Sequence, residues 1–266
     1  SSSSVNSSSS SSISISYSKI DGQKIYFTSA GNKISGFLYK PEGSVTFPAI
    51  VYLHGGSSGV SQDVKDASRT LMNSGYVVIA PNYPGESDSG GTFGDHDEEI
   101  ISAFDAVLYL KSLNYVKKNK IGLVGSSHGA GIALDLIENY LNVNGNDNIQ
   151  VAVEMFGGVD AKAVCEYWVT TGKKSSCDEP ESEFIKQSPI FRVDRINVPL
   201  LIIHGAKDKV VPVKEAYKLE TELRNLGKVY DIKIYANSGH GFVYTKTVES
   251  SQARSEITKW LNKYLK

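Results

Sequence analysis

One serine of this chain stands between two glycines, in the stretch Gly125 to Gly129 that reads Gly-Ser-Ser-His-Gly and matches G-x-S-x-G. The apolar run Ile121 to Val124 precedes this stretch and the helix-like run Ala130 to Glu138 follows it, so it falls on a turn from strand to helix, as the motif requires. The start of a helix favours negative charge that develops on a reacting group. This setting predicts Ser127 as a nucleophile.

A serine hydroxyl is a weak nucleophile at neutral pH and needs a histidine base that a carboxylate orients. On this kind of turn the chain order is serine, acid, histidine. His54 and His96 precede the serine, His128 adjoins it and His204 lies at the end of a strand. His240, on a loop flanked by glycines, is therefore predicted as the general base, and we assign His54 and His204 structural roles.

The orienting acid is expected between the serine and His240, at the end of a strand. Asp208 satisfies this condition, because it closely follows the apolar run Leu200 to Ile203. Asp194 and Asp231 are alternatives, and Asp208 could also be an ordinary turn residue. The sequence favours Asp208.

A glycine pair in His54-Gly55-Gly56 follows the apolar run Ala49 to Leu53. Glycines leave backbone N–H groups open to a substrate oxygen, and we predict that the N–H groups of Gly56 and His128 form an oxyanion hole. The alternative is a glycine turn without a catalytic use.

Short β-rich runs alternate with helical stretches from Lys19 onward, which indicates a mostly parallel sheet covered on both faces. The runs Ile25 to Thr28 and Lys33 to Tyr39 predict an antiparallel hairpin at one edge. The remaining strands are expected at Ala49 to Leu53, Tyr76 to Ala80, Ile121 to Val124, Val151 to Met155, Leu200 to Ile203, and around Ile232 and Ile234. Helical core stripes are expected at Ile100, Phe104, Val107 and Leu108, at Leu219, Leu223 and Leu226, and at Ile257, Trp260, Leu261 and Tyr264. We therefore expect an α/β fold of the α/β-hydrolase class, with about eight strands.

Residues 157 to 197 interrupt the alternation and are interpreted as a small insertion or lid over the carboxyl edge of the sheet, where such sheets bind ligands. They contain the two cysteines, Cys165 and Cys177. We expect a disulfide, with two free thiols as the alternative. Such a bridge would pin the insertion and leave the chemistry untouched.

The amino-terminal residues are dominated by serine: ten of the first twelve are Ser. We expect residues 1–18 to be disordered and residues 19–266 to form one catalytic domain. The run is typical of an extracellular or cell-surface tether, and Asn6 is a possible glycosylation acceptor. A cytoplasmic protein, or a run that is not native, is the alternative.

Composition limits the partners of this chain. The formal net charge is -1, which gives no reason to expect nucleic acid, and no apolar stretch approaches the roughly 20 residues of a membrane span. The acidic residues Asp95 to Glu99 are expected to offset a helix dipole rather than to bind metal, and no nucleotide-binding glycine motif is complete. We expect a small-molecule ester or short peptide as substrate and no cofactor.

These motifs, together with Asn82-Tyr83-Pro84-Gly85 and Gly239-His240-Gly241-Phe242, stand in an order that resembles the catalytic domain of the prolyl oligopeptidase family and the dienelactone-hydrolase-like esterases. The resemblance implies a triad of Ser127, Asp208 and His240, oxyanion donors at Gly56 and His128, and no metal or organic cofactor. Two features differ: we expect no room among these residues for the β-propeller of large peptidases, and dienelactone hydrolases have cysteine in place of Ser127.

We therefore expect a carboxylic ester hydrolase that forms an acyl-enzyme on Ser127. A serine peptidase of the prolyl oligopeptidase type, acting on short peptides or amino-acid amides, is the first alternative. A binding protein that retains the fold without activity is the second.

Overall fold

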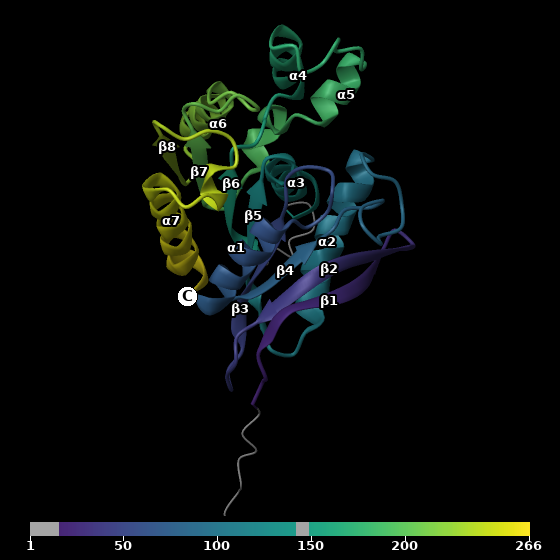
Figure 1. Cartoon of the computed structure of the whole chain (residues 1–266), viewed down its shortest axis with the longest axis vertical. Coiled ribbons are helices and arrows are strands. Elements are labelled where there is room, and N and C mark those ends of the chain that lie inside the picture. Colours follow the sequence, from purple (N-terminus) through teal and green to yellow (C-terminus); the bar gives the residue numbers. More distant parts are fainter. Residues whose placement is uncertain (1–15, 142–148) are drawn as a thin grey trace, which may run out of the picture.

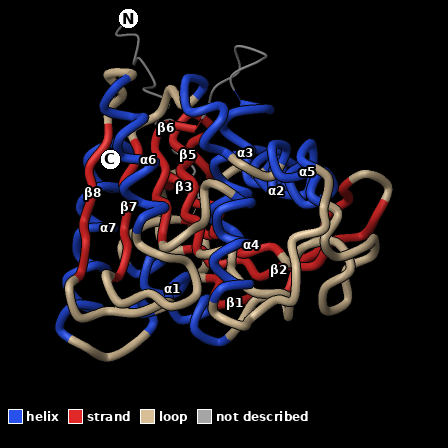
Figure 2. Tube along the Cα trace, turned by 90° about the horizontal axis from the view of Figure 1, so that it is seen from above, coloured by secondary structure: helices blue, strands red, loops and turns tan. Residues whose placement is uncertain are grey.

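The computed structural model describes residues 16–141 and 149–266, and an eight-stranded sheet runs through its centre (Figures 1 and 2). Its strands are β1 (Ile20–Ser29), β2 (Asn32–Lys40), β3 (Phe47–Leu53), β4 (Val77–Pro81), β5 (Val116–Ser126), β6 (Ile149–Met155), β7 (Leu200–Gly205) and β8 (Tyr230–Tyr235). They lie in the order β1-β2-β4-β3-β5-β6-β7-β8. The hairpin β1–β2 and the pair β2–β4 are antiparallel, and all later pairs are parallel. The fold is that of an α/β-hydrolase, as predicted.

Helices cover both faces of the sheet because successive residues of the central strands point to opposite sides. In β3, Val51 belongs to one buried cluster with α2 (His96–Ser112), α3 (His128–Leu136) and α6 (Lys214–Asn225). Its neighbour Tyr52 belongs to the other, with α1 (Gln62–Asn73) and α7 (Val248–Leu265). A short π-helix, η1 (Ile137–Leu141), continues α3, and a 3-10 turn, η3 (Phe242–Tyr244), precedes α7.

The segment between β6 and β7 forms α4 (Ala161–Thr170), α5 (Glu181–Lys186) and the 3-10 helix η2 (Pro189–Arg195). Helices α4 and α5 contact each other above α3, at the upper end of Figure 1. The predicted disulfide is present, with the Cα atoms of Cys165 and Cys177 6.0 Å apart, and joins α4 to the loop before α5.

Two predicted core residues are wrong. Leu108 of α2 is 43% exposed and Leu226, directly after α6, is 45% exposed. The buried stripe of α2 runs instead through Ala103, Ala106 and Leu110, because that face of the helix packs on the sheet.

Most of the serine-rich segment, residues 1–15, lies outside the described residues, and so does Asn6. Tyr17, within the range expected to be disordered, instead forms an antiparallel bridge with Gly43. Among residues 16–141 and 149–266, no helix is both long and apolar enough to cross a bilayer.

Candidate active site

Ser127 occupies the sharp turn between β5 and α3, where its backbone has φ 52° and ψ −119°. This left-handed φ is uncommon for a residue with a side chain and costs free energy that the surrounding packing must offset. A Cβ at Gly125 would lie 2.4 Å from the carbonyl oxygen of Gly129, and one at Gly129 would lie 2.3 Å from that of Leu53. The motif needs both glycines because strand and helix meet at these distances.

A hydrogen-bonded chain joins the three residues predicted from the sequence. The Nε2 atom of His240 lies 3.0 Å from Ser127 Oγ, and its Nδ1 atom lies 2.7 Å from Asp208 Oδ2. The His240 side chain is 21% exposed, whereas that of Asp208 is fully buried. The ring of Phe156, which itself has a positive φ of 45°, packs edge-on against the imidazole at 5.0 Å. Three segments far apart in the sequence thus converge on one imidazole.

The second oxygen of Asp208 is also engaged. Oδ1 accepts hydrogen bonds from the backbone N–H groups of Val210 at 2.8 Å and Val211 at 2.9 Å. Burial alone would raise the pKa of Asp208, but its contacts with His204 and His240 and the Val210 N–H hold that pKa well below its usual range. The carboxylate is therefore ionised at neutral pH and fixed in orientation.

The two alternative acids lie elsewhere. Asp194 is an exposed residue of η2, and Asp231 of β8 forms an ion pair with Lys233 at 2.9 Å. The buried His204 donates from Nε2 to the carbonyl of Val211 at 3.0 Å, consistent with the structural role expected for it.

Contacts of the buried His54 side chain fix the loop after β3. His54 is fully buried, with Nδ1 3.0 Å from the carbonyl oxygen of Gly55 and Nε2 3.1 Å from Glu86 Oε2. A Cβ at Gly55 would lie 2.8 Å from Ser127 Cβ, so this glycine permits the close approach of the loop to the serine. Gly56 has a φ of +77° and no heavy atom within 4 Å of a Cβ built there, so its surroundings are open.

Glu99 is a residue of this site that the sequence did not single out. Its side chain is almost fully buried, and Oε2 lies 2.9 Å from Nε2 of His128, the residue after the serine. The expected role of the acidic stretch, to offset the helix dipole, suits Asp95, the N-cap of α2, but not Glu99. A signal was available, since Glu99 precedes the buried residues Ala103 and Ala106 by four and seven positions.

A cavity of about 360 Å³ opens beside Ser127, between α3 and the segment that carries α4 and α5. Cys165 of α4 lines it together with Ser127 and His128. The bridge is predicted to leave the chemistry untouched, but Cys165 lies in the wall of the cavity that Ser127 also lines, because α4 covers the carboxyl edge of the sheet there. The Trp168 indole donates to the carbonyl oxygen of Val210 at 2.7 Å and so ties this cavity wall to the Asp208 loop.

Comparison with known proteins agrees with this architecture. Residues 63–266 match the prolyl oligopeptidase family. The chain is 26% identical over 256 residues to the uncharacterized peptidase YtmA of Bacillus subtilis, covering 89% of this chain and 91% of that protein. It is 25% identical over 242 residues to acylamino-acid-releasing enzyme 1 of Oryza sativa, covering 84% of this chain but 31% of that enzyme.

Solved structures show the same fold. The acylaminoacyl peptidase of Pyrococcus horikoshii superposes with a TM-score of 0.78 at 19% identity, over 94% of this chain and 42% of that one. The Pyrococcus furiosus esterase Pf2001 superposes with a TM-score of 0.74 at 19% identity, over 93% and 92%. The fold and the family match together define a serine hydrolase. The chain belongs to the prolyl oligopeptidase family.

Proposed function

We propose that this chain hydrolyses carboxylic esters through an acyl-enzyme on Ser127, with His240 as general base and Asp208 as the residue that orients it. The observation that carries the proposal is the hydrogen-bonded chain from Asp208 Oδ2 through His240 to Ser127 Oγ, with contacts of 2.7 and 3.0 Å. The order of the three residues, and the atoms through which they contact one another, are those of a serine nucleophile with a histidine base that an acid orients.

In this mechanism Ser127 Oγ attacks the ester carbonyl while His240 Nε2 takes its proton, and the imidazolium is stabilised by the ionised Asp208. The N–H groups of Gly56 and His128 donate to the oxygen that becomes negative in the tetrahedral intermediate. His240 then returns the proton to the leaving alcohol. A water molecule, deprotonated by the same imidazole, releases the acid and restores the serine.

Hydrolysis of short peptides or amino-acid amides is the second candidate, and a specific observation favours it. The relatives that match over most of this chain are named as peptidases or as acylamino-acid-releasing enzymes. The same residues can perform both reactions, since amides and esters both pass through a tetrahedral intermediate.

We also infer that the chain works in an oxidising compartment, outside the cell or at its surface. The disulfide between Cys165 and Cys177 supports this location, because cytosolic thiols are kept reduced.

Rates on an ester and an anilide of one acyl group, together with labelling by a fluorophosphonate, test the proposal. We expect Ser127→Ala to lose both labelling and turnover, and Ser126→Ala to keep most of its activity. Ser126 is a fair control because its buried hydroxyl accepts a hydrogen bond from Tyr244 at 2.9 Å, whereas His240 contacts the hydroxyl of Ser127. A Ser127→Ala protein with wild-type turnover would refute the assignment, and a faster anilide than ester would favour the peptidase.

A further inference from the structure

We propose that the cavity beside Ser127 binds a positively charged group on the acyl part of the substrate, and that the carboxylate of Glu183 recognises that group. The inference rests on the proposed acyl transfer at Ser127 and adds the class of substrate to it.

The position of the cavity indicates that it binds the acyl part of the substrate. Ser127 and His128 line it, whereas His240 lines a different hollow formed by residues between Asn237 and Glu249. The histidine must lie beside the leaving group, because it returns the proton there. The hollow at His240 therefore suits the leaving group, and the cavity at His128 suits the acyl chain.

The walls of the cavity suit a long side chain. Ile132, Val164, Trp168 and Phe184 supply apolar surface, and about 360 Å³ is enough for a side chain of the length of lysine or arginine. A methylene stem can pack on such walls while its charged end reaches a carboxylate. Aromatic rings also attract cations, which adds to the preference.

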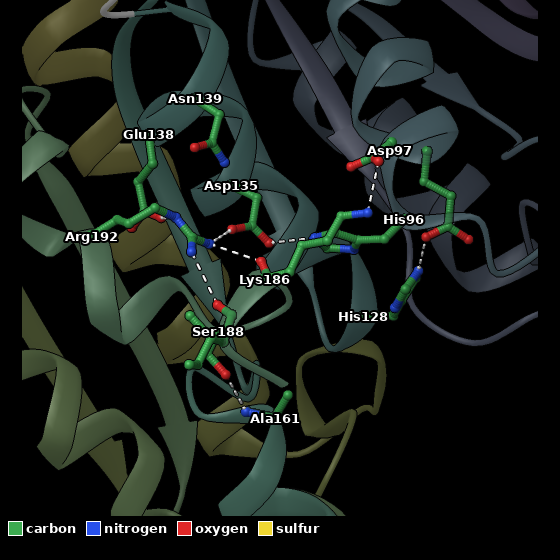
Figure 3. A network of polar contacts seen from close by, with 12 residues as sticks. His96, Asp97, His128, Asp135, Glu138, Asn139, Ala161, Lys186, Ser188 and Arg192 are labelled. Atoms are coloured by element: carbon green, nitrogen blue, oxygen red, sulfur yellow. Dashed lines mark hydrogen bonds and ion pairs between the residues drawn. The ribbon is translucent and has the colours of Figure 1, made fainter. Parts of the chain in front are cut away.

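Asp135, an acid deep in the cavity, already has partners (Figure 3). Its Oδ1 atom lies 2.5 Å from the Arg192 guanidinium and its Oδ2 atom lies 3.0 Å from His96 Nε2. Its neighbour Glu138 shares the same guanidinium, and burial together with the charge of Asp135 raises the pKa of Glu138 to about 9. The Arg192 guanidinium therefore contacts both of these buried carboxyl groups.

The other charged side chains of the cavity also have a partner of opposite charge, with one exception. Lys174 pairs with Glu179 at 2.7 Å, and the nearby Lys186 pairs with Asp97 at 2.7 Å. Glu183, which is half-buried and lines the cavity, forms no ion pair within the described part of the chain.

A carboxylate without an ion pair, in a pocket whose other charged side chains have partners, favours a cation and disfavours an acidic acyl group, because a partly buried charge is stabilised by a partner. The cation can be a lysine or arginine side chain, or the free α-ammonium group of an aminoacyl substrate. Both present hydrogen-bond donors with a positive charge.

Steady-state hydrolysis of matched esters tests this inference. The first arm compares an Nα-blocked lysine ester with the Nα-blocked norleucine ester, which has a similar stem without the charge. The second compares a leucine ester that has a free amine with its N-acetylated form. Each pair is measured with the wild type, with Glu183→Gln and with Glu181→Gln, whose carboxylate pairs with Lys162 and does not line the cavity.

We expect the wild type to favour the cationic member of at least one pair by about 10-fold to 100-fold in kcat/KM, as a charged hydrogen bond provides. Glu183→Gln should remove most of that preference, and Glu181→Gln should retain it. The affected pair identifies whether the side chain or the α-amine binds.

Equal preference in Glu183→Gln and the wild type, or no preference in either, would overturn this inference while the neutral esters still report acyl transfer. Failure of the proposed function is distinguishable, since no ester would then be hydrolysed and fluorophosphonate would not label Ser127.

Discussion

Asp208→Asn tests the proposed role of the acid most sharply, because the structure determines how the new amide would lie. Oδ1 of Asp208 accepts the N–H groups of Val210 and Val211. An asparagine that kept its oxygen there would point its NH₂ group at His240 Nδ1, which is 2.7 Å from the other oxygen. The flipped amide would lose two backbone hydrogen bonds, each worth about 0.5 to 1.5 kcal/mol.

The expected effect follows from the tautomer of the histidine. Facing an NH₂ donor, His240 Nδ1 must accept, so its proton moves to Nε2 and the ring can no longer take the proton of Ser127. In serine proteases this change costs about 10⁴-fold in kcat, which corresponds to about 5.4 kcal/mol of transition-state stabilisation. The Asp208→Asn protein keeps the two backbone contacts, so its thermal midpoint should change little.

The assay is kcat on a short acyl ester, with the thermal midpoint as a test of folding. Asp231→Asn is the matched control, because Asp231 lies on β8 and pairs with Lys233 instead of the histidine. We expect that variant to retain wild-type turnover. A loss of only a fewfold in Asp208→Asn would refute the reasoning, since another group would then have to set the tautomer of His240.

Reduction of the Cys165–Cys177 disulfide should lower the thermal midpoint by about 5 to 10 °C, because it removes about 3 kcal/mol of stability. It should also raise KM, because Cys165 lines the cavity at Ser127. Calorimetry and rate measurements in reductant check both effects, and an unchanged KM would count against the second. In the folded protein the pKa of Glu138 is raised to about 9, so this residue stays protonated there while it ionises in the unfolded chain. The free energy of unfolding should therefore fall by up to about 1.4 kcal/mol per pH unit from about pH 5 to 9. Glu138→Gln should remove that part of the slope in urea titrations, and an identical slope in both proteins would contradict a protonated Glu138.

The strands and the proposed triad could be predicted because their signals are local. A buried parallel strand is a short apolar run, and the nucleophile lies in a pentapeptide between strand and helix. Chain order and the preceding strand predict Asp208 as the acid, and the structure brings this residue, rather than Asp194 or Asp231, against the imidazole.

The contacts that the sequence could not predict join residues far apart in the chain. Glu99 meets His128 across 29 positions, and Trp168 reaches the carbonyl of Val210 across 42. The helical period indicates that Glu99 lies on the buried face of α2, but it does not identify the residue of another element that this face contacts. The point where a loop crosses has no sequence period. The position of Cys165 in the cavity wall has the same origin, since nothing in the spacing of the cysteines indicates which side of α4 faces the serine.

The two proposed oxyanion donors belong to different loops, so their separation must be fixed by something that contacts both. Tyr83 does so. Its hydroxyl donates to the carbonyl oxygen of His54 at 3.0 Å, and its ring packs against the rings of His54 at 4.5 Å and His128 at 5.5 Å. The far sides of those two rings are held by carboxylates, Glu86 at His54 and Glu99 at His128. We therefore expect the distance between the N–H groups of Gly56 and His128 to depend on the packing around Tyr83 as well as on the glycine loop, because a movement of either loop would change its contacts with the tyrosine.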